Sequence, residues 1–101
     1  MYSVKQQVAP VDDFMRLRQV AGLSARPRAG AERALPNSLY GVQITLSGLV
    51  VGMGRVVGDG GLNFEIVDVA VDPEHQGKGL GRQIMSHIMG YLERAAPQGA
   101  Y

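Results

Sequence analysis

Apolar and polar positions recur with two different periods along the chain, and each period predicts a different kind of element. Alternation over residues 2–8 favours a short strand, which a proline then ends. Apolar residues three and four apart predict a helix that Asp12 or Asp13 caps and that runs to about Ala21. The stretch that follows is rich in Arg, Ala and Pro and allows a short helix over about 29–35.

From residue 40 the pattern changes to three strands joined by tight turns. Residues 40–46 alternate between apolar side chains and glycine or polar residues, which is typical of a half-buried strand. A Ser-Gly turn leads to a strand over 49–57, whose two glycines indicate bulges or close backbone approach. After an Asp-Gly-Gly turn, Phe64–Val71 is almost continuously apolar, which favours a central strand covered on both faces.

The last predicted element is an amphipathic helix from about Gly79 to Ala95. Its apolar positions recur every three or four residues, at Leu80, Ile84, Ile88, Leu92 and Ala95. Strands linked as hairpins and flanked by helices predict an α+β fold. We expect a mainly antiparallel, four-stranded sheet with flanking helices in a single domain over residues 1–101.

Composition and charge then exclude several classes of function. Ten Lys and Arg against nine Asp and Glu leave a formal charge of +1, so we expect no nucleic-acid partner. The chain has no cysteine, and its two histidines lie twelve residues apart, so we expect no metal site. No signal core and no apolar run of about 18 residues is present, which favours a cytoplasmic protein without a membrane partner. Five arginines are diluted by nearby carboxylates and indicate a solvated face: Arg16, Arg18, Arg26, Arg28 and Arg33.

The strongest chemical signal is a glycine-rich loop between the last strand and the last helix. Gly77, Gly79 and Gly81 have no Cβ, so backbone N–H groups there can approach an anion closely. The helix start adds unpaired N–H donors and the positive end of the helix dipole. Lys78 and Arg82 can add charge-assisted bonds. Together these features predict a pyrophosphate-binding site.

Two common phosphate-binding motifs do not fit this loop. A P-loop requires Gly-x-x-x-x-Gly-Lys-Ser/Thr, but Asp72 stands at the first glycine and Gly79 at the hydroxyl position. A dinucleotide fingerprint requires Gly-x-Gly-x-x-Gly at the start of a βαβ unit. This loop instead has Gly-x-Gly-x-Gly after antiparallel strands.

A third pattern, Gln-x-x-Gly-x-Gly, does match, over residues 76–81, and V-x-V-x-P precedes it at 69–73. In this setting the chain resembles the GNAT-type N-acetyltransferases, which transfer an acetyl group from acetyl-CoA to an amine. The resemblance covers about residues 39–94 well, and the first strand and helix loosely. It implies a GNAT-like fold, acetyl-CoA as cosubstrate, and a small-molecule or peptide amine as acceptor.

The resemblance also implies roles for single residues. The pantetheine arm would pair with the strand backbone at Val69, Ala70 and Val71, and an N–H near Val69 would polarise the thioester carbonyl. Glu65 matches the place of the general base in members that have one, whereas many relatives use water. Backbone groups of the loop would hold the pyrophosphate, at Gln76, Gly77, Lys78, Gly79, Leu80, Gly81 and Arg82.

In the family, a splayed strand, a helix and two more strands follow the glycine-rich helix, and a tyrosine there protonates the leaving thiolate. The chain ends at Tyr101, so we expect a truncated domain without those C-terminal strands and helix. Residues 64–71 would then form an open edge that allows homodimerisation. Three functions stay open. The first is an N-acetyltransferase that works by direct attack on the thioester, and the second is a catalytically incomplete acyl-CoA-binding fragment that associates through this edge. The third is a domain that uses the edge for association only and does not bind coenzyme A.

Overall fold

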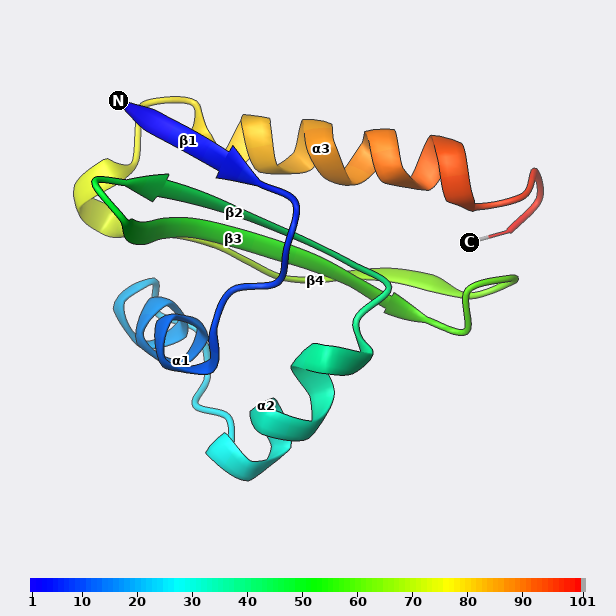
Figure 1. Cartoon of the computed structure of the whole chain (residues 1–101), viewed down its shortest axis with the longest axis horizontal. Helices are drawn as coiled ribbons and strands as arrows, with labels where there is room; N and C mark the ends of the chain where they lie inside the picture. The colour runs from blue at the N-terminus through cyan, green and yellow to red at the C-terminus, as the bar shows by residue number, and fades with distance from the viewer. Residues whose placement is uncertain (101) are drawn as a thin grey trace.

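The computed structural model describes residues 1–100, which form one sheet between two layers of helix. Its strands pair antiparallel in the order β1-β2-β3-β4, which is also their order along the chain. Helix α3 covers one face of the sheet, and α1 and α2 cover the other (Figure 1). The elements are β1 (Tyr2–Lys5), α1 (Val11–Val20), α2 (Arg28–Ala34), the 3-10 turn η1 (Leu35–Asn37), β2 (Tyr40–Leu46), β3 (Leu49–Gly58), β4 (Phe64–Val71), the 3-10 turn η2 (Pro73–His75) and α3 (Leu80–Ala95).

Every element that the hydrophobic pattern predicts is present, and the main differences lie at the amino-terminal end. Strand β1 ends at Lys5, three residues earlier than predicted. Helix α1 begins at Val11 and its N-cap is Pro10, so the prediction that Asp12 or Asp13 caps the helix is wrong, and both lie in its first turn. Their carboxylates there face the positive end of the helix dipole, which stabilises the helix.

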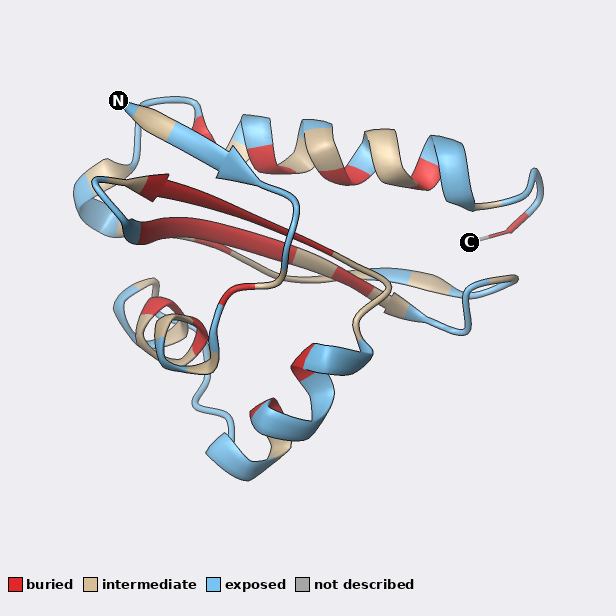
Figure 2. Cartoon of the chain, viewed as in Figure 1, coloured by how far each residue is buried: buried red, intermediate tan, exposed pale blue. Residues whose placement is uncertain are grey.

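Helix α3 packs its apolar stripe on β2 and β3, whose central residues are buried (Figure 2). Glycines in β3 allow this close approach. A Cβ at Gly54 would lie 2.7 Å from Cγ2 of Ile84 and 3.0 Å from Cδ1 of Ile88. The close backbone approach predicted for β3 is therefore confirmed. The buried cluster on this face comprises Val42, Ile44, Val51, Val56, Leu80, Ile84, Ile88 and Leu92.

The opposite face of the sheet is also covered, so the prediction that residues 40–46 form a half-buried strand is wrong. Gln43 and Thr45, on the polar positions of β2, are only 5% and 7% exposed. The Gln43 side chain is satisfied there, because its Nε2 donates to the carbonyl of Val8 at 3.3 Å. A second buried cluster fills the space beneath α1 and α2, at Ala9, Phe14, Leu17, Ala31, Leu35, Val50, Met53 and Ala70.

Strand β4 has the predicted bounds, Phe64–Val71, but lies at the edge of the sheet that the structure describes. The prediction of a central strand is therefore wrong for residues 1–100, and most side chains of β4 are half-buried rather than buried. Its outer side has no neighbouring strand in this part of the chain. Within the same residues, no helix is long and apolar enough to cross a bilayer.

Candidate functional site

The loop between β4 and α3 is held open by hydrogen bonds at its base and by two glycines at its crest. Oδ1 of Asp72 accepts the backbone N–H of Glu74 at 2.9 Å, and Nε2 of Gln76 donates to the carbonyl of Val71 at 3.2 Å. Gly77 and Gly79 have φ angles of +78° and +80°, which L side chains rarely adopt. A Cβ on either glycine would meet no atom within 4 Å, so the crest of the loop faces open space.

A row of backbone donors lines this crest. Gln83 is the first residue whose N–H donates into α3, to the carbonyl of Gly79 at 3.1 Å. Within residues 1–100, the N–H groups of 77–82 donate to no backbone or side-chain acceptor. Unpaired donors at a helix start, next to the positive end of its dipole, form a site that suits an anion such as a pyrophosphate.

The loop and β4 together border an open hollow of about 320 Å³. Eight of the ten residues predicted to bind the cosubstrate line it: Val69, Ala70, Val71, Gln76, Gly77, Gly79, Leu80 and Gly81. The other two, Lys78 and Arg82, are exposed and do not line it.

His75 also lines the hollow, and the sequence motif gives it no role there. Its Nδ1 lies 2.8 Å from the hydroxyl of Tyr2, and the two rings meet edge to face with centroids 5.7 Å apart. Strand β1 therefore supports the loop from 73 residues away in sequence. No local sequence pattern indicates this side-chain contact, because the two residues lie far apart along the chain.

Strand β4 carries a bulge at the point where it borders the hollow. Met53 pairs with Ala70 and Arg55 with Val67, so Asp68 and Val69 together stand opposite the single residue Gly54. Asp68 has a φ of +57°, in the left-handed region. The two-residue bulge points Val69 toward the α3 side, while Asp68 turns to the α1 side.

Asp68 bonds two arginines, and one of them, Arg18, is an exception to the predicted solvated arginine face, on which Arg26, Arg28 and Arg33 are exposed. Nε of Arg55 donates to Oδ2 of Asp68 at 2.6 Å, and Arg18 of α1 donates to Oδ1. The Arg18 side chain is only 11% exposed. Asp68 thus ties β4 to the first helix.

Glu65, the candidate base, lies apart from the glycine-rich loop. It is exposed and borders a separate hollow of about 270 Å³ near Asn63. Its neighbours Phe64 and Ile66 pack on the α3 side, so Glu65 falls on the α1 side of the strand. Strict alternation would place Glu65 and Asp68 on opposite faces of β4, but the bulge puts them on the same face.

The geometry suits a ligand with an anionic end at the loop and an extended arm along β4. Main-chain pairing with the free strand edge would hold such an arm. Among residues 1–100, no three His, Cys, Asp or Glu side chains gather in a way that would hold a metal ion.

Two proteins are similar to this chain, one in sequence and the other in both sequence and structure. An uncharacterized N-acetyltransferase, ycf52-like, from Prochlorococcus marinus is 34% identical over 96 residues, which cover 89% of this chain and 53% of the relative. This chain thus spans about half the length of that curated relative. A Staphylococcus aureus protein of unknown function, described as a probable acetyltransferase, is 40% identical with a TM-score of 0.95. The match covers 100% of this chain and 76% of that protein.

A third comparison shows the fold in a ligand-bound protein. A GNAT family acetyltransferase from Brucella melitensis, solved in complex with acetyl-CoA, is 17% identical with a TM-score of 0.71. The match covers 99% of this chain and 71% of that protein. The model of the acetyltransferase (GNAT) family matches residues 11–100. The GNAT-like fold and the family resemblance are both confirmed, and this chain belongs to the GNAT acetyltransferase family.

Proposed function

We propose that this chain is an acetyl-CoA-dependent N-acetyltransferase that transfers the acetyl group to a primary amine by direct attack on the thioester. Family membership supports acetyl transfer, and the acetyl-CoA complex of the Brucella melitensis protein supports the cosubstrate. The observation that carries the proposal is the row of unpaired N–H groups over residues 77–82 beside a free strand edge. Those donors suit the pyrophosphate of coenzyme A, and Gly77 and Gly79 leave room for it.

Strand β4 binds the pantetheine arm in this proposal. Val69, Ala70 and Val71 lie on the free edge and line the same hollow as the loop. Their main-chain groups pair with the amides of the arm as a neighbouring strand would. The bulge at Asp68 breaks regular pairing next to Val69, and an N–H near Val69 stabilises the thioester oxygen as it gains charge.

The transfer itself needs a free amine and a leaving thiolate. The amine nitrogen bonds the acetyl carbon, the carbon–sulfur bond breaks, and the proton that the nitrogen loses balances the one that the sulfur gains. Glu65 accepts the amine proton through water, from the α1 side of β4. We assign this role to Glu65 from its position in β4. Its carboxylate lies outside the hollow of the glycine-rich loop, so a water molecule must carry the proton to it.

Calorimetric titration with coenzyme A and acetyl-CoA tests the binding step, with NAD and ATP as control ligands. Gly81→Glu is the informative variant, because an added Cβ there meets only Cγ2 of Val71 at 4.0 Å. The helix therefore accepts the side chain, while its charge repels the pyrophosphate. We expect binding to weaken at least about tenfold, which corresponds to about 1.4 kcal/mol.

Gly90→Glu is the matched control on the same helix. Its carboxylate would lie beside Arg94 one turn later, away from the loop. Coenzyme A affinity should be unchanged in this variant. Equal affinity for coenzyme A in Gly81→Glu and in the unmodified chain would refute the proposed loop site, as would equally tight binding of NAD or ATP.

The second candidate is an acyl-CoA-binding module that associates through β4 without transferring the acetyl group. The position of β4 at the sheet edge favours it, because main-chain groups on that edge can pair with another strand. Thiol release from acetyl-CoA with a panel of amines separates the two functions. Amine-dependent release supports the transferase. Binding of acetyl-CoA without such release, together with dimerisation in light scattering, supports the module.

A further inference from the structure

The peptide unit between Asp68 and Val69 lies within the bulge of β4. The pairing of β3 with β4 skips these two residues, which together stand opposite Gly54. Asp68 also has a φ of +57°, a conformation that an L residue keeps only where its surroundings fix it. Because a peptide unit is planar, the direction of the Val69 N–H is set by the backbone of the two residues that flank it. The contacts that hold Asp68 and Val69 therefore also orient this N–H.

Two arginines from different elements hold the carboxylate of Asp68. Arg18 of α1 donates to one oxygen, and Nε of Arg55 in β3 donates to the other at 2.6 Å. Each guanidinium is bonded a second time, since Arg18 donates to the carbonyl of Ser24 at 2.7 Å and Arg55 donates to Oγ of Ser38 at 3.0 Å. The Asp68 cluster (Arg18, Arg55 and Asp68) is therefore anchored at both of its ends.

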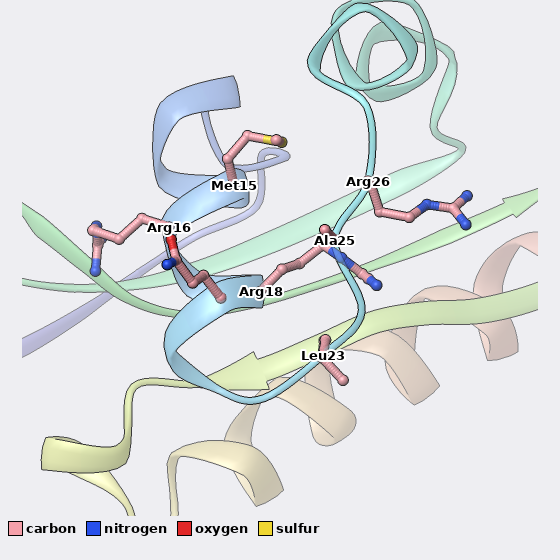
Figure 3. A pocket seen from close by; sticks show the side chains of 7 residues that line it. Met15, Arg16, Arg18, Leu23, Ala25 and Arg26 are labelled. Carbon is pink, nitrogen blue, oxygen red and sulfur yellow. The ribbon is translucent and has the colours of Figure 1, made fainter.

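The Asp68 cluster packs on an aromatic ring and is shielded from water. The Cζ atoms of Arg18 and Arg55 each lie 5.9 Å from the ring centroid of Phe14, whose side chain is buried. Arg18 also lines a hollow of about 600 Å³, and Figure 3 shows it extending from α1 to the segment that carries Ala25. Salt screens ion pairs in such surroundings far less than exposed ones, so the cluster holds a fixed geometry.

The other end of the peptide unit is held by apolar packing. Val69 packs against the buried cluster on the α3 side, and its Cγ2 would lie 3.5 Å from a Cβ at Gly54. The bulge is thus fixed by charge on the α1 face and by apolar contact on the α3 face. Val69 also lines the hollow of the glycine-rich loop, where the proposed function places the thioester.

We infer that Asp68 is a positioning residue for the thioester. Its carboxylate, held by Arg18 and Arg55, fixes the peptide unit so that the Val69 N–H points at the thioester oxygen. Asp68 acts through its own backbone, because its side chain is turned to the α1 side, away from the hollow of the loop. This role rests on the proposed function, which places the thioester at Val69 without depending on how the bulge is held.

A matched pair of ligands tests this role by calorimetry. In S-ethyl-CoA a methylene replaces the carbonyl of acetyl-CoA, so only acetyl-CoA can accept the Val69 N–H. The unmodified chain should bind acetyl-CoA about three- to fivefold more tightly than S-ethyl-CoA, which is the effect of one hydrogen bond. A general loss of structure would weaken both ligands together, so the ratio of the two affinities separates positioning from stability.

Asp68→Asn should bring this ratio to about one, because an amide has one acceptor oxygen and turns its NH2 toward the second arginine. The affinity for S-ethyl-CoA should change by less than about twofold. Arg18→Gln is a second, milder variant, since Arg55 still pairs with Asp68 in it. Its ratio should also fall, because the contact with α1 is lost.

Two control variants should keep the ratio of the unmodified chain. Asp12→Asn makes the same exchange in an exposed pair, where Oδ1 of Asp12 lies 2.6 Å from Arg28. Leu92→Val removes buried volume toward the far end of α3, so it lowers stability without contact to the bulge.

A ratio of about one in the unmodified chain, or a ratio retained in folded Asp68→Asn or Arg18→Gln, would overturn the positioning role. Either result, together with coenzyme A binding that Gly81→Glu weakens, would leave the proposed function in place. No binding of coenzyme A, acetyl-CoA or S-ethyl-CoA by the unmodified chain would overturn the proposed function, and the positioning role with it.

Discussion

Nε of Arg55 in β3 lies 2.6 Å from Oδ2 of Asp68 in β4, where the two strands leave regular pairing. The other oxygen of this carboxylate accepts from Arg18, so one aspartate joins α1, β3 and β4. The side chains of Asp68, Arg18 and Arg55 are 9%, 11% and 13% exposed. A carboxylate so nearly buried between two arginines stabilises the bulge, and its loss would leave two shielded cations unpaired.

Asp68→Asn should therefore lower the free energy of unfolding by about 3 kcal/mol. Asparagine keeps the size of the side chain and tolerates the left-handed backbone, so only the charge is lost. Urea unfolding measures the effect. Asp12→Asn breaks an exposed pair with Arg28 and removes one favourable charge from the start of α1, so it should destabilise the chain far less than Asp68→Asn. Equal destabilisation by the two variants would contradict this account of Asp68.

Gly54→Ala tests how closely α3 packs on the sheet. Its Cβ would lie 2.7 Å from Cγ2 of Ile84, so the helix must shift, and we expect a loss of about 1–3 kcal/mol in stability. Gly30→Ala is the control in α2, where the nearest atom is Cγ of Pro27 at 3.5 Å. That variant should gain up to about 1 kcal/mol from helix propensity. A thermal or urea melt in which both variants gain stability would refute the packing argument.

Tyr2→Phe removes the hydroxyl that holds His75 beside the glycine-rich loop. If the loop binds coenzyme A as proposed, its affinity should fall about three- to fivefold, because a single hydrogen bond contributes about 1 kcal/mol. Calorimetry measures the affinity. Tyr40→Phe also removes one hydroxyl bond, to Oε1 of Gln6 at 2.9 Å, and should leave affinity unchanged. A Tyr2→Phe variant that binds coenzyme A normally would show that β1 does not support the site.

Asp59 should make the β3–β4 hairpin sensitive to acid. Its Oδ1 accepts the backbone N–H groups of Gly61, Leu62 and Asn63, and these bonds hold the pKa of the carboxyl well below its usual range. Because this pKa is lower in the folded chain than in the unfolded chain, the Asp59 carboxylate stabilises the fold fully at a pH above its pKa in the unfolded chain, about 3.9. This stabilisation declines as the pH falls below that value.

Melting temperatures of the chain and of Asp59→Asn, measured from pH 7 downward, test this dependence. Asparagine keeps one acceptor oxygen but carries no charge. The variant should melt lower at neutral pH, and the gap should narrow below about pH 4. A gap that stays constant from pH 7 to pH 2.5 would mean that the charge of Asp59 does not stabilise the turn.

Local patterns predict most of the secondary structure of this chain. The apolar stripe of α3 and the bounds of β4 follow from periods that each segment carries in its own residues. The glycine-rich loop is also readable, because glycine spacing before a helix start favours an anion site. Eight of the ten residues that this motif and the family resemblance imply line one hollow.

Contacts between distant segments could not be predicted from the sequence, because no local pattern of residues indicates them. The pairing of Tyr2 with His75 spans 73 residues, and the pairing of Arg18 with Asp68 spans 50. Asp68 lies on the α1 side only because the bulge shifts the alternation of β4 by one residue. Periodicity assumes a regular strand, so it assigns the wrong face to residues beyond a bulge.

The sequence by itself determined the elements, the glycine-rich loop and the family, since each depends on residues close together in the chain. Only the tertiary structure decided which face each strand buries, that Tyr2 of β1 contacts His75, and which arginines have no carboxylate partner. Arg26 and Arg18 are the same residue type eight positions apart, yet one is exposed and the other bonds Asp68. Their difference arises from the packing of α1 against β4, because a charge is paired or free according to what folding brings beside it.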